Sequence, residues 1–128
     1  MLSHHQPSDE YGFSQYVRVP TGTSLAFISG QSAYDPARSG YAPDFAEQVE
    51  QCFRNLLATI AEAGGSAETV VKVTTLVVDL NDDRHNALDD AMKRHFPKDH
   101  YPASTLIPVP RLSTEGMMIE IDAVVAVS

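Results

Sequence analysis

The sequence predicts an α+β fold, with elements in the order β-β-α-β-α-β-β and two helices covering one face of a sheet. Residues 44–63 and 82–96 repeat apolar side chains at spacings of three and four, which is typical of amphipathic helices. Residues 70–80 are rich in β-branched side chains, and every odd-numbered residue of 117–127 is apolar, which is typical of strands. Two helices can cover only one face of such a sheet, so its other face needs a different cover.

One domain is expected to span residues 1–128. With 43% hydrophobic and 20% charged residues, the chain can bury one core without metal or disulfide support. Residues 1–10 are polar, contain Pro7 and lack periodicity, so we expect them to form a flexible arm. The adjacent His4 and His5 have no Cys or acidic neighbour at ligand spacing, so we expect no metal site there.

Charge and composition argue against several classes of function. Nine Lys and Arg against seventeen Asp and Glu give a net charge of −8, and no basic run offers a stripe for phosphates, so no nucleic acid partner is expected. The chain has no bilayer-spanning apolar run and no secretion signal, so we expect no membrane insertion and a cytoplasmic location. Cys52 is the only cysteine and lies in the apolar stripe of residues 44–63, which indicates a buried thiol rather than a nucleophile.

The first two strands are expected at residues 16–19 and 25–29. The segment between them, residues 20–23, contains Pro and Gly and is typical of a hairpin turn. Residues 32–43 contain two prolines and a glycine, so we expect a loop that leads to the first helix.

Both helices have terminal signals. Residues 64–65, both glycine, end the first helix, and Asn81 or Asp82 can cap the second. On the second helix His85 and Asp89 are one turn apart, so we expect them to be neighbours on an exposed polar face.

Residues 101–112 read as a strand although they include Pro102, Pro108 and Pro110. Proline has no N–H and is excluded from a strand that is bonded on both sides. Because all three prolines have even numbers, their missing donors would lie along one edge of an extended segment. The sequence therefore predicts an edge strand.

The last strand is expected to place Glu120 and Asp122 on the sheet face that the helices leave open. Burial of a bare carboxylate costs on the order of several kcal/mol, so either this face is wet or a partner reaches it. The rest of the face is substantially apolar, and self-association would cover it. The residues expected there are Ile28, Thr74, Leu76, Val78, Val124 and Ala126.

A series of short motifs extends along the chain from about Tyr16 to Val127. They are Ile28-Ser29-Gly30-Gln31, Gln51 to Asn55, Val71-Lys72-Val73-Thr74 with Asp79-Leu80-Asn81, His85-Asn86, Phe96, Tyr101-Pro102-Ala103 and Ile119-Glu120-Ile121-Asp122-Ala123. In this order and spacing the motifs resemble those of the RidA/YjgF family.

The resemblance implies a chorismate-mutase-like fold assembled as a homotrimer. The three sheets would form an inner barrel, with a pocket for a small-molecule metabolite at each subunit interface. Typical active members hydrolyse reactive enamines and imines, such as 2-aminoacrylate, to ammonia and a keto acid. They use no metal and no organic cofactor, so the resemblance implies none here.

In such members an arginine follows the Pro-Ala pair and binds the substrate carboxylate, whereas this chain has Ser104 at that position. Arg111 is seven residues further on and would face the other way in an extended strand. Loss of a two-pronged charged contact would weaken binding by roughly two to four decades. We therefore expect a less acidic enamine, imine or amide-like substrate, to which Ser104 and Thr105 could donate hydrogen bonds. Ser104 can also be an ordinary strand residue.

The resemblance implies further site residues. Glu120 matches the carboxylate that orients or activates water, and is the expected catalytic group. Tyr16 matches a pocket tyrosine, Gly30 a glycine that lines the pocket, and Asn86 a helix asparagine. Arg111 completes the expected substrate-binding set if the strand bulges near its prolines.

Each of these residues has a structural alternative. Tyr16 can be an interface aromatic, and Asn86 can bond to the backbone near the helix start. Glu120 can be a structural carboxylate, held by backbone amides or by a basic side chain, Lys72 or Arg111.

Three functions are compatible with these observations. The first is a cofactor-free hydrolase or deaminase of the RidA type with altered specificity. The second is a trimeric binding module that keeps the pocket but has lost the chemistry. The third is the ribonuclease or translation inhibitor activity attached to some relatives, which the charge of −8 supports poorly because phosphate binding depends on clustered cations.

Overall fold

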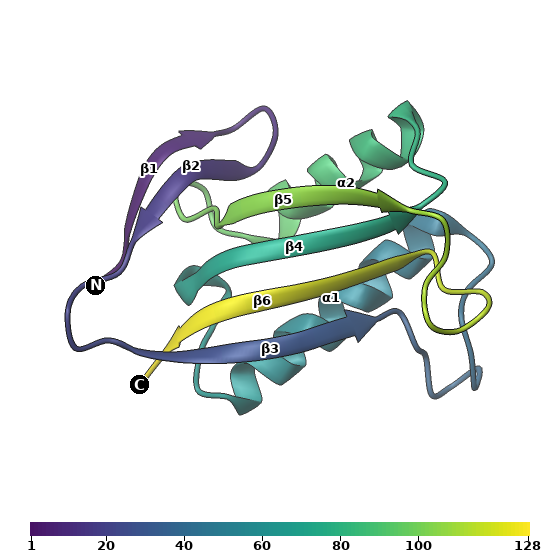
Figure 1. The fold of residues 1–128 in the computed structure, drawn as a ribbon, viewed down its shortest axis with the longest axis horizontal. Coiled ribbons are helices and arrows are strands. Elements are labelled where there is room, and N and C mark those ends of the chain that lie inside the picture. Colours follow the sequence, from purple (N-terminus) through teal and green to yellow (C-terminus); the bar gives the residue numbers. More distant parts are fainter.

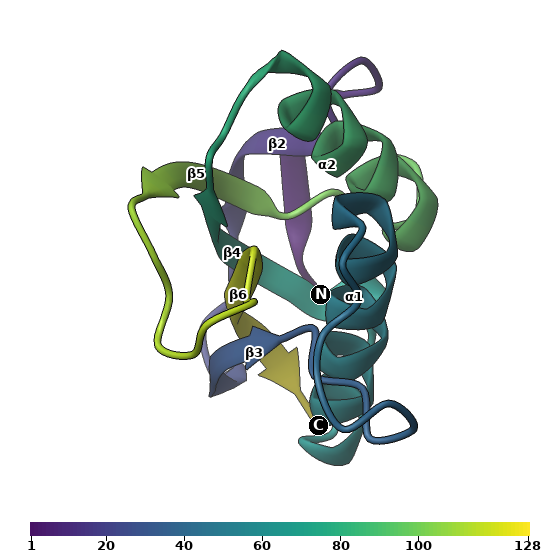
Figure 2. The same cartoon turned by 90° about the vertical axis from the view of Figure 1, so that its right-hand side faces the viewer.

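Two helices lie against one face of a twisted sheet in the computed structural model, which describes residues 1–128 (Figures 1 and 2). The predicted α+β fold with both helices on one face is confirmed. The strands are β1 Ser3–Ser8, β2 Phe13–Arg18, β3 Ser24–Ser32, β4 Val70–Val78, β5 Ala103–Val109 and β6 Ile119–Val127, and the helices are α1 Phe45–Glu62, the short 3₁₀ helix η1 Ala67–Thr69 and α2 Asp82–His95.

The main sheet has four strands in the order β3-β6-β4-β5. β6 is antiparallel to both β3 and β4, whereas β4 and β5 are parallel. This parallel pair follows from the chain order, because α2 carries the chain back between β4 and β5. β1 and β2 form a separate two-stranded antiparallel sheet, which lies beside the start of β5 in Figure 1.

The N-terminal region differs from the prediction in two ways. Residues 1–10, expected as a flexible arm, contain β1, and β2 pairs with β1 rather than in a hairpin with β3. β1 pairs with β2 through backbone groups rather than side chains, so its polar side chains give no periodic signal in the sequence. Pro7 is tolerated because β1 is bonded on one side only.

The hairpin of β1 and β2 is anchored to the chain that enters β5. The Ser14 hydroxyl donates to the carbonyl of Tyr101 at 2.6 Å, and the Ser14 amide donates to the carbonyl of Pro102 at 3.0 Å. At the hairpin tip, Gly12 has φ +74°, and a Cβ there would lie 2.9 Å from the Cβ of Met92 on α2. The tip therefore packs directly against α2, and only glycine fits at this approach.

Both main helices begin at a capping side chain, which for the second helix is Asn81, one of its two predicted caps. The Asp44 carboxylate accepts from the Glu47 amide at 3.1 Å, and the Asn81 side chain accepts from the Arg84 amide at 2.8 Å. Such caps satisfy amides that have no partner inside the helix. After α1, Gly64 adopts φ +97°, which reverses the chain toward η1.

The core lies between the helices and the sheet. The apolar stripe of α1 is buried except for Phe45 and Leu57, which are partly buried, and it packs in one cluster with the odd-numbered residues of β6 and with alternate residues of β4, as expected. The thiol of Cys52 is part of this core and donates to the carbonyl of Gln31 at 3.2 Å. Burial raises the pKa of Cys52 to about 12, so the thiol stays protonated near neutral pH.

Ile28 lies on the opposite face from the predicted one. It pairs with the buried Ala123 and belongs to the core, whereas its neighbour Phe27 pairs with Val124 on the open face and is 78% exposed. The ladder between β3 and β6 shifts register between Ile28 and Gln31. The prediction for Ile28 was therefore wrong: Ala26 and Ile28 share the core face by ordinary alternation, and the bulge inverts the facing only of residues after Ile28.

β5 is an edge strand of the main sheet, as its prolines predicted. It pairs only with β4, Pro108 lies within it, and Pro102 and Pro110 flank it. No helix is long and apolar enough to cross a membrane.

Candidate functional site

The Glu120 carboxylate lies directly against Gly30. The two residues come from neighbouring strands, β6 and β3, and Gly30 is at the point where the ladder shifts register. A Cβ built at Gly30 would lie 2.4 Å from Oε2 of Glu120 and 2.6 Å from its Cδ. With the Glu120 side chain in this conformation, only a residue without a side chain at position 30 leaves room for its carboxylate.

Glu120 is half-buried on the open face of the sheet, opposite Leu76 of β4. It makes no hydrogen bond or ion pair within the chain, so it is not held by Lys72 or Arg111. A half-buried carboxylate without a partner in its own chain has its acceptor oxygens free for water or a ligand.

Lys72 occupies the same open face, four residues along β4 from Leu76, the residue that pairs with Glu120. Its ammonium donates to the hydroxyl of Thr105 at 2.9 Å, to the hydroxyl of Thr74 at 3.2 Å and to the carbonyl of Val73 at 2.9 Å. Partial burial lowers the pKa of Lys72, while the nearby Asp122 carboxylate opposes that shift. Thr105 is therefore an acceptor for a lysine within its own chain.

Ser104 lies on the other side of the sheet from Glu120. It pairs with Val73, a core residue on the helix side, whereas Glu120 pairs with Leu76, which pairs in turn with Ile107. Ser104 borders a cavity of about 340 Å³ between β5, α2 and the hairpin tip. Within one chain, no small ligand touches both Ser104 and Glu120.

His85 and Asp89 line the cavity beside Ser104. Nε2 of His85 is 3.5 Å from Oδ2 of Asp89, and the Asp89 side chain is only 17% exposed. Burial raises the pKa of Asp89, against the opposing effects of His85 and Lys93. The expectation of a plain exposed face is therefore wrong for Asp89, because the hairpin tip covers it.

Sequence reasoning missed this cavity because its walls come from three distant segments. Tyr11 and Phe13 flank Gly12, and their rings stack with centroids 6.4 Å apart at the cavity rim. A glycine between two aromatic residues near the N-terminus was the available signal, since it allows the backbone to approach α2 closely.

The other expected site residues lie apart from one another. Tyr16, 49% exposed, stacks on His5 of the hairpin with centroids 4.5 Å apart. Asn86 is exposed on α2, and its side chain makes no hydrogen bond within the chain. Arg111 is in the loop after β5, where its guanidinium donates to the carbonyls of Leu112 at 3.0 Å and Ser113 at 3.4 Å. Arg111 lines a separate cavity of about 300 Å³.

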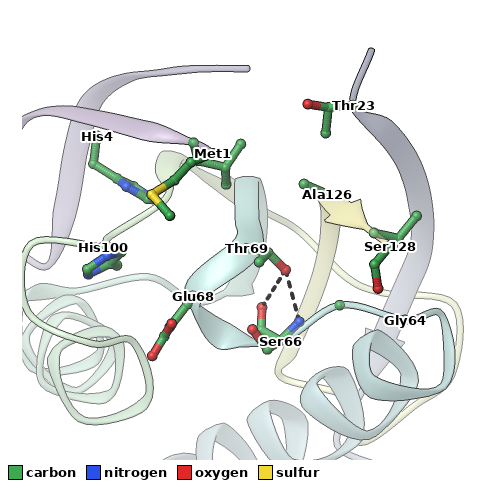
Figure 3. A pocket seen from close by; sticks show the side chains of 13 residues that line it. Met1, His4, Thr23, Gly64, Ser66, Glu68, Thr69, His100, Ala126 and Ser128 are labelled. Carbon is green, nitrogen blue, oxygen red and sulfur yellow. Dashed lines mark hydrogen bonds between the residues drawn. The ribbon is translucent and has the colours of Figure 1, made fainter. Parts of the chain in front are cut away.

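A further cavity of about 600 Å³ lies at the end of the sheet where β1, η1 and the end of β6 meet (Figure 3). His4 and His100 face each other on its wall with ring centroids 5.1 Å apart, and Ser66 and Thr69 are joined by hydrogen bonds. Burial, with help from His100 and His5, lowers the pKa of His4. No group of three or more His, Cys, Asp or Glu side chains is arranged to hold a metal.

Comparison with known proteins relates the chain to one family. The family described as Endoribonuclease L-PSP matches residues 4–127. A RutC family protein of Sinorhizobium fredii is 34% identical over 117 residues, which is 91% of this chain and 87% of the relative. A 2-iminobutanoate/2-iminopropanoate deaminase of Salmonella typhimurium is 34% identical over 112 residues, covering 85% of this chain and 84% of the relative.

Solved structures agree with these sequence matches. A Rid family protein of unknown function from Yersinia pestis superposes with a TM-score of 0.86 at 26% identity, covering 94% of this chain and 91% of that one. RidA from an Antarctic Psychrobacter superposes with a TM-score of 0.72 at 30% identity, covering 94% of this chain and 96% of that one.

Proposed function

Because the chain belongs to the RidA/YjgF family, described as Endoribonuclease L-PSP, we propose that it is a homotrimeric hydrolase that deaminates a small enamine or imine without a cofactor. The observation that carries the proposal is the contact between Gly30 and Glu120, in which the missing side chain of Gly30 leaves room for the carboxylate on the open face. The deaminase named for the relative from Salmonella typhimurium supports the reaction class.

The proposed reaction needs only water. Water adds to the carbon of the C=N bond, the nitrogen takes up a proton, and the resulting carbinolamine loses ammonia to leave a carbonyl compound. Glu120 transfers a proton from the attacking water to the imine nitrogen, and then transfers the hydroxyl proton of the carbinolamine to the leaving nitrogen, so no net proton is consumed. An enamine first moves a proton from its nitrogen to its β-carbon to give the imine. General acid–base catalysis of this kind contributes roughly 10²–10⁴-fold to a rate.

The open face supports the proposed trimer. Phe27 is 78% exposed there, and Leu25 and Ile107 are each at least 40% exposed. Copies of the same chain would bury these side chains and exclude water around Glu120. A site that includes both Ser104 and Glu120 needs two subunits, because these residues occupy opposite faces of one sheet.

Substrate binding is proposed to involve Ser104, Tyr16, Gly30 and Asn86, with neutral donors in place of an arginine. Arg111 is the weakest member of the expected set, because its guanidinium is already bonded to backbone carbonyls of its own loop. The Thr105 hydroxyl accepts a hydrogen bond from Lys72, so Thr105 would contribute to substrate binding together with Lys72. These contacts suit a neutral substrate rather than a carboxylate.

The test is ammonia release from a panel of freshly generated imines and enamines, compared with buffer. Glu120→Gln should lower the rate by roughly 10²–10⁴-fold. Asp122→Asn, on the same strand face, is the matched control and should retain most activity. No acceleration by the wild-type protein with any compound would refute the proposal.

A binding module without chemistry is the alternative outcome. It would show ligands that stabilise the protein against thermal unfolding and emerge unchanged, with affinity retained in Glu120→Gln. A ribonuclease activity is not proposed, because phosphate binding depends on clustered cations and the chain has a net charge of −8.

A further inference from the structure

The cavity beside Ser104 has the size and walls of a small-molecule site. Its volume is about 340 Å³, within the range of ligand pockets. Leu88 and Met92 of α2 form its buried floor, and Phe13 and Leu106 close its sides. These walls fit a short apolar body such as an alkyl chain or a ring.

The side chains that line the cavity carry more negative than positive charge when His85 is neutral. Asp89 is the only carboxylate that lines the cavity, and no lysine or arginine lines it. The nearest ammonium, that of Lys93, lies 3.5 Å from Oδ1 of Asp90, which is 63% exposed outside the cavity. His85, 3.5 Å from Asp89, is a counter-charge only when it is protonated.

The Asp89 carboxylate accepts no hydrogen bond within the chain, although its side chain is only 17% exposed. Burial raises its pKa, as expected of a carboxylate that has lost part of its hydration without gaining hydrogen-bond donors. A ligand cation would supply the missing donor and charge. The stacked rings of Tyr11 and Phe13 at the rim add faces that attract cations.

We infer that this cavity binds a protonated amine, with Asp89 as its counter-ion and Ser104 as a second hydrogen-bonding partner. The inference rests on the proposed function and names the substrate class, which is an enamine or imine that bears an amine and a short apolar body. A carboxylate-bearing substrate is disfavoured, because it would meet Asp89 with a like charge at low exposure.

Calorimetric titration of the full chain with three probes of similar shape tests the inference: phenethylamine, phenethyl alcohol and 3-phenylpropionate. We expect the amine to bind at least tenfold more tightly than the other two. Asp89→Asn should weaken amine binding by about ten- to hundredfold, the effect of one charged hydrogen bond. Asp90→Asn removes the same charge from the next residue outside the cavity, and should change amine binding by less than about twofold.

A second variant reverses the charge of the cavity. Ser104→Arg should abolish the preference for phenethylamine and favour 3-phenylpropionate, because the new guanidinium would pair with Asp89 and attract carboxylates. Equal binding of all three probes to the wild-type protein, or equal losses in Asp89→Asn and Asp90→Asn, would overturn the inference.

The two proposals fail separately. Release of ammonia from neutral imines together with no amine preference would overturn the assignment of this cavity and leave the hydrolase proposal intact. Selective amine binding with no turnover of any imine, amine-bearing ones included, would refute the hydrolase and support this cavity as an amine site.

Discussion

Replacing Gly30 with alanine tests the central contact of the proposed site. The added Cβ would lie 2.4 Å from Oε2 of Glu120, whereas ordinary contact begins at 3.4 Å, so the carboxylate must move by about 1 Å. The clashing atoms are at the free end of a flexible side chain, so a change of rotamer relieves most of the strain. We expect a loss of stability of about 1 kcal/mol, at the low end for overpacking.

Gly30→Ala should lower the rate of ammonia release by more than its small loss of stability can explain. A displacement of about 1 Å at a reacting group can cost on the order of a hundredfold in rate. The measurement is kcat for ammonia release, together with the free energy of unfolding from a denaturant titration on the same samples. Because the effect acts through the carboxylate, the double variant with Glu120→Gln should be no slower than Glu120→Gln alone.

Gly40→Ala is the matched control for this substitution. Its Cβ would meet only the carbonyl of Arg38 at 3.9 Å, and its backbone needs no glycine conformation. It should leave rate and stability nearly unchanged. The reasoning is refuted if Gly30→Ala keeps full activity, or if its activity falls only in proportion to the unfolded fraction.

Three further predictions concern assembly and stability. Phe27→Asp places a charge on the apolar open face and should convert a trimer to smaller species at micromolar concentration, measured by sedimentation. Phe53→Ala empties a fully buried site beside His95 and should cost about 3–5 kcal/mol in chemical denaturation. Glu50 accepts hydrogen bonds from Arg94 and His95, so Glu50→Gln should cost up to about 1 kcal/mol at pH 7. Burial raises the pKa of Glu50, but these hydrogen bonds outweigh burial and lower the pKa below 4.5 in the folded protein. The stability difference between Glu50→Gln and wild type, measured by thermal unfolding, should therefore vanish as the pH falls through that lowered pKa.

The helices and the edge strand followed from local rules. A capping side chain, an apolar repeat and a terminal glycine act within a few residues, so the bounds of α1 and α2 agree with prediction to within one or two residues. Each proline around β5 likewise lacks its own backbone N–H, so the strand can pair along one edge only.

The site was less predictable, because its parts are joined by pairing rather than by sequence. Gly30 and Glu120 were expected together from the resemblance, and the structure puts them in contact. The cavity beside Ser104 was not expected, since Asp89 looks like a solvent-exposed helix residue until the hairpin tip packs over it.

The amino-acid sequence by itself determined which segments are helices, which strand lies at the edge and which side of β6 is core, because those choices depend on side-chain spacing and on donors that each residue has or lacks. Only the tertiary structure decided that β2 pairs with β1, that Ile28 faces the helices and that Ser104 and Glu120 lie on opposite faces. Strand partners are selected by backbone hydrogen bonds that every residue except proline can form, and the face that a side chain takes is set by the register of its strand with those partners.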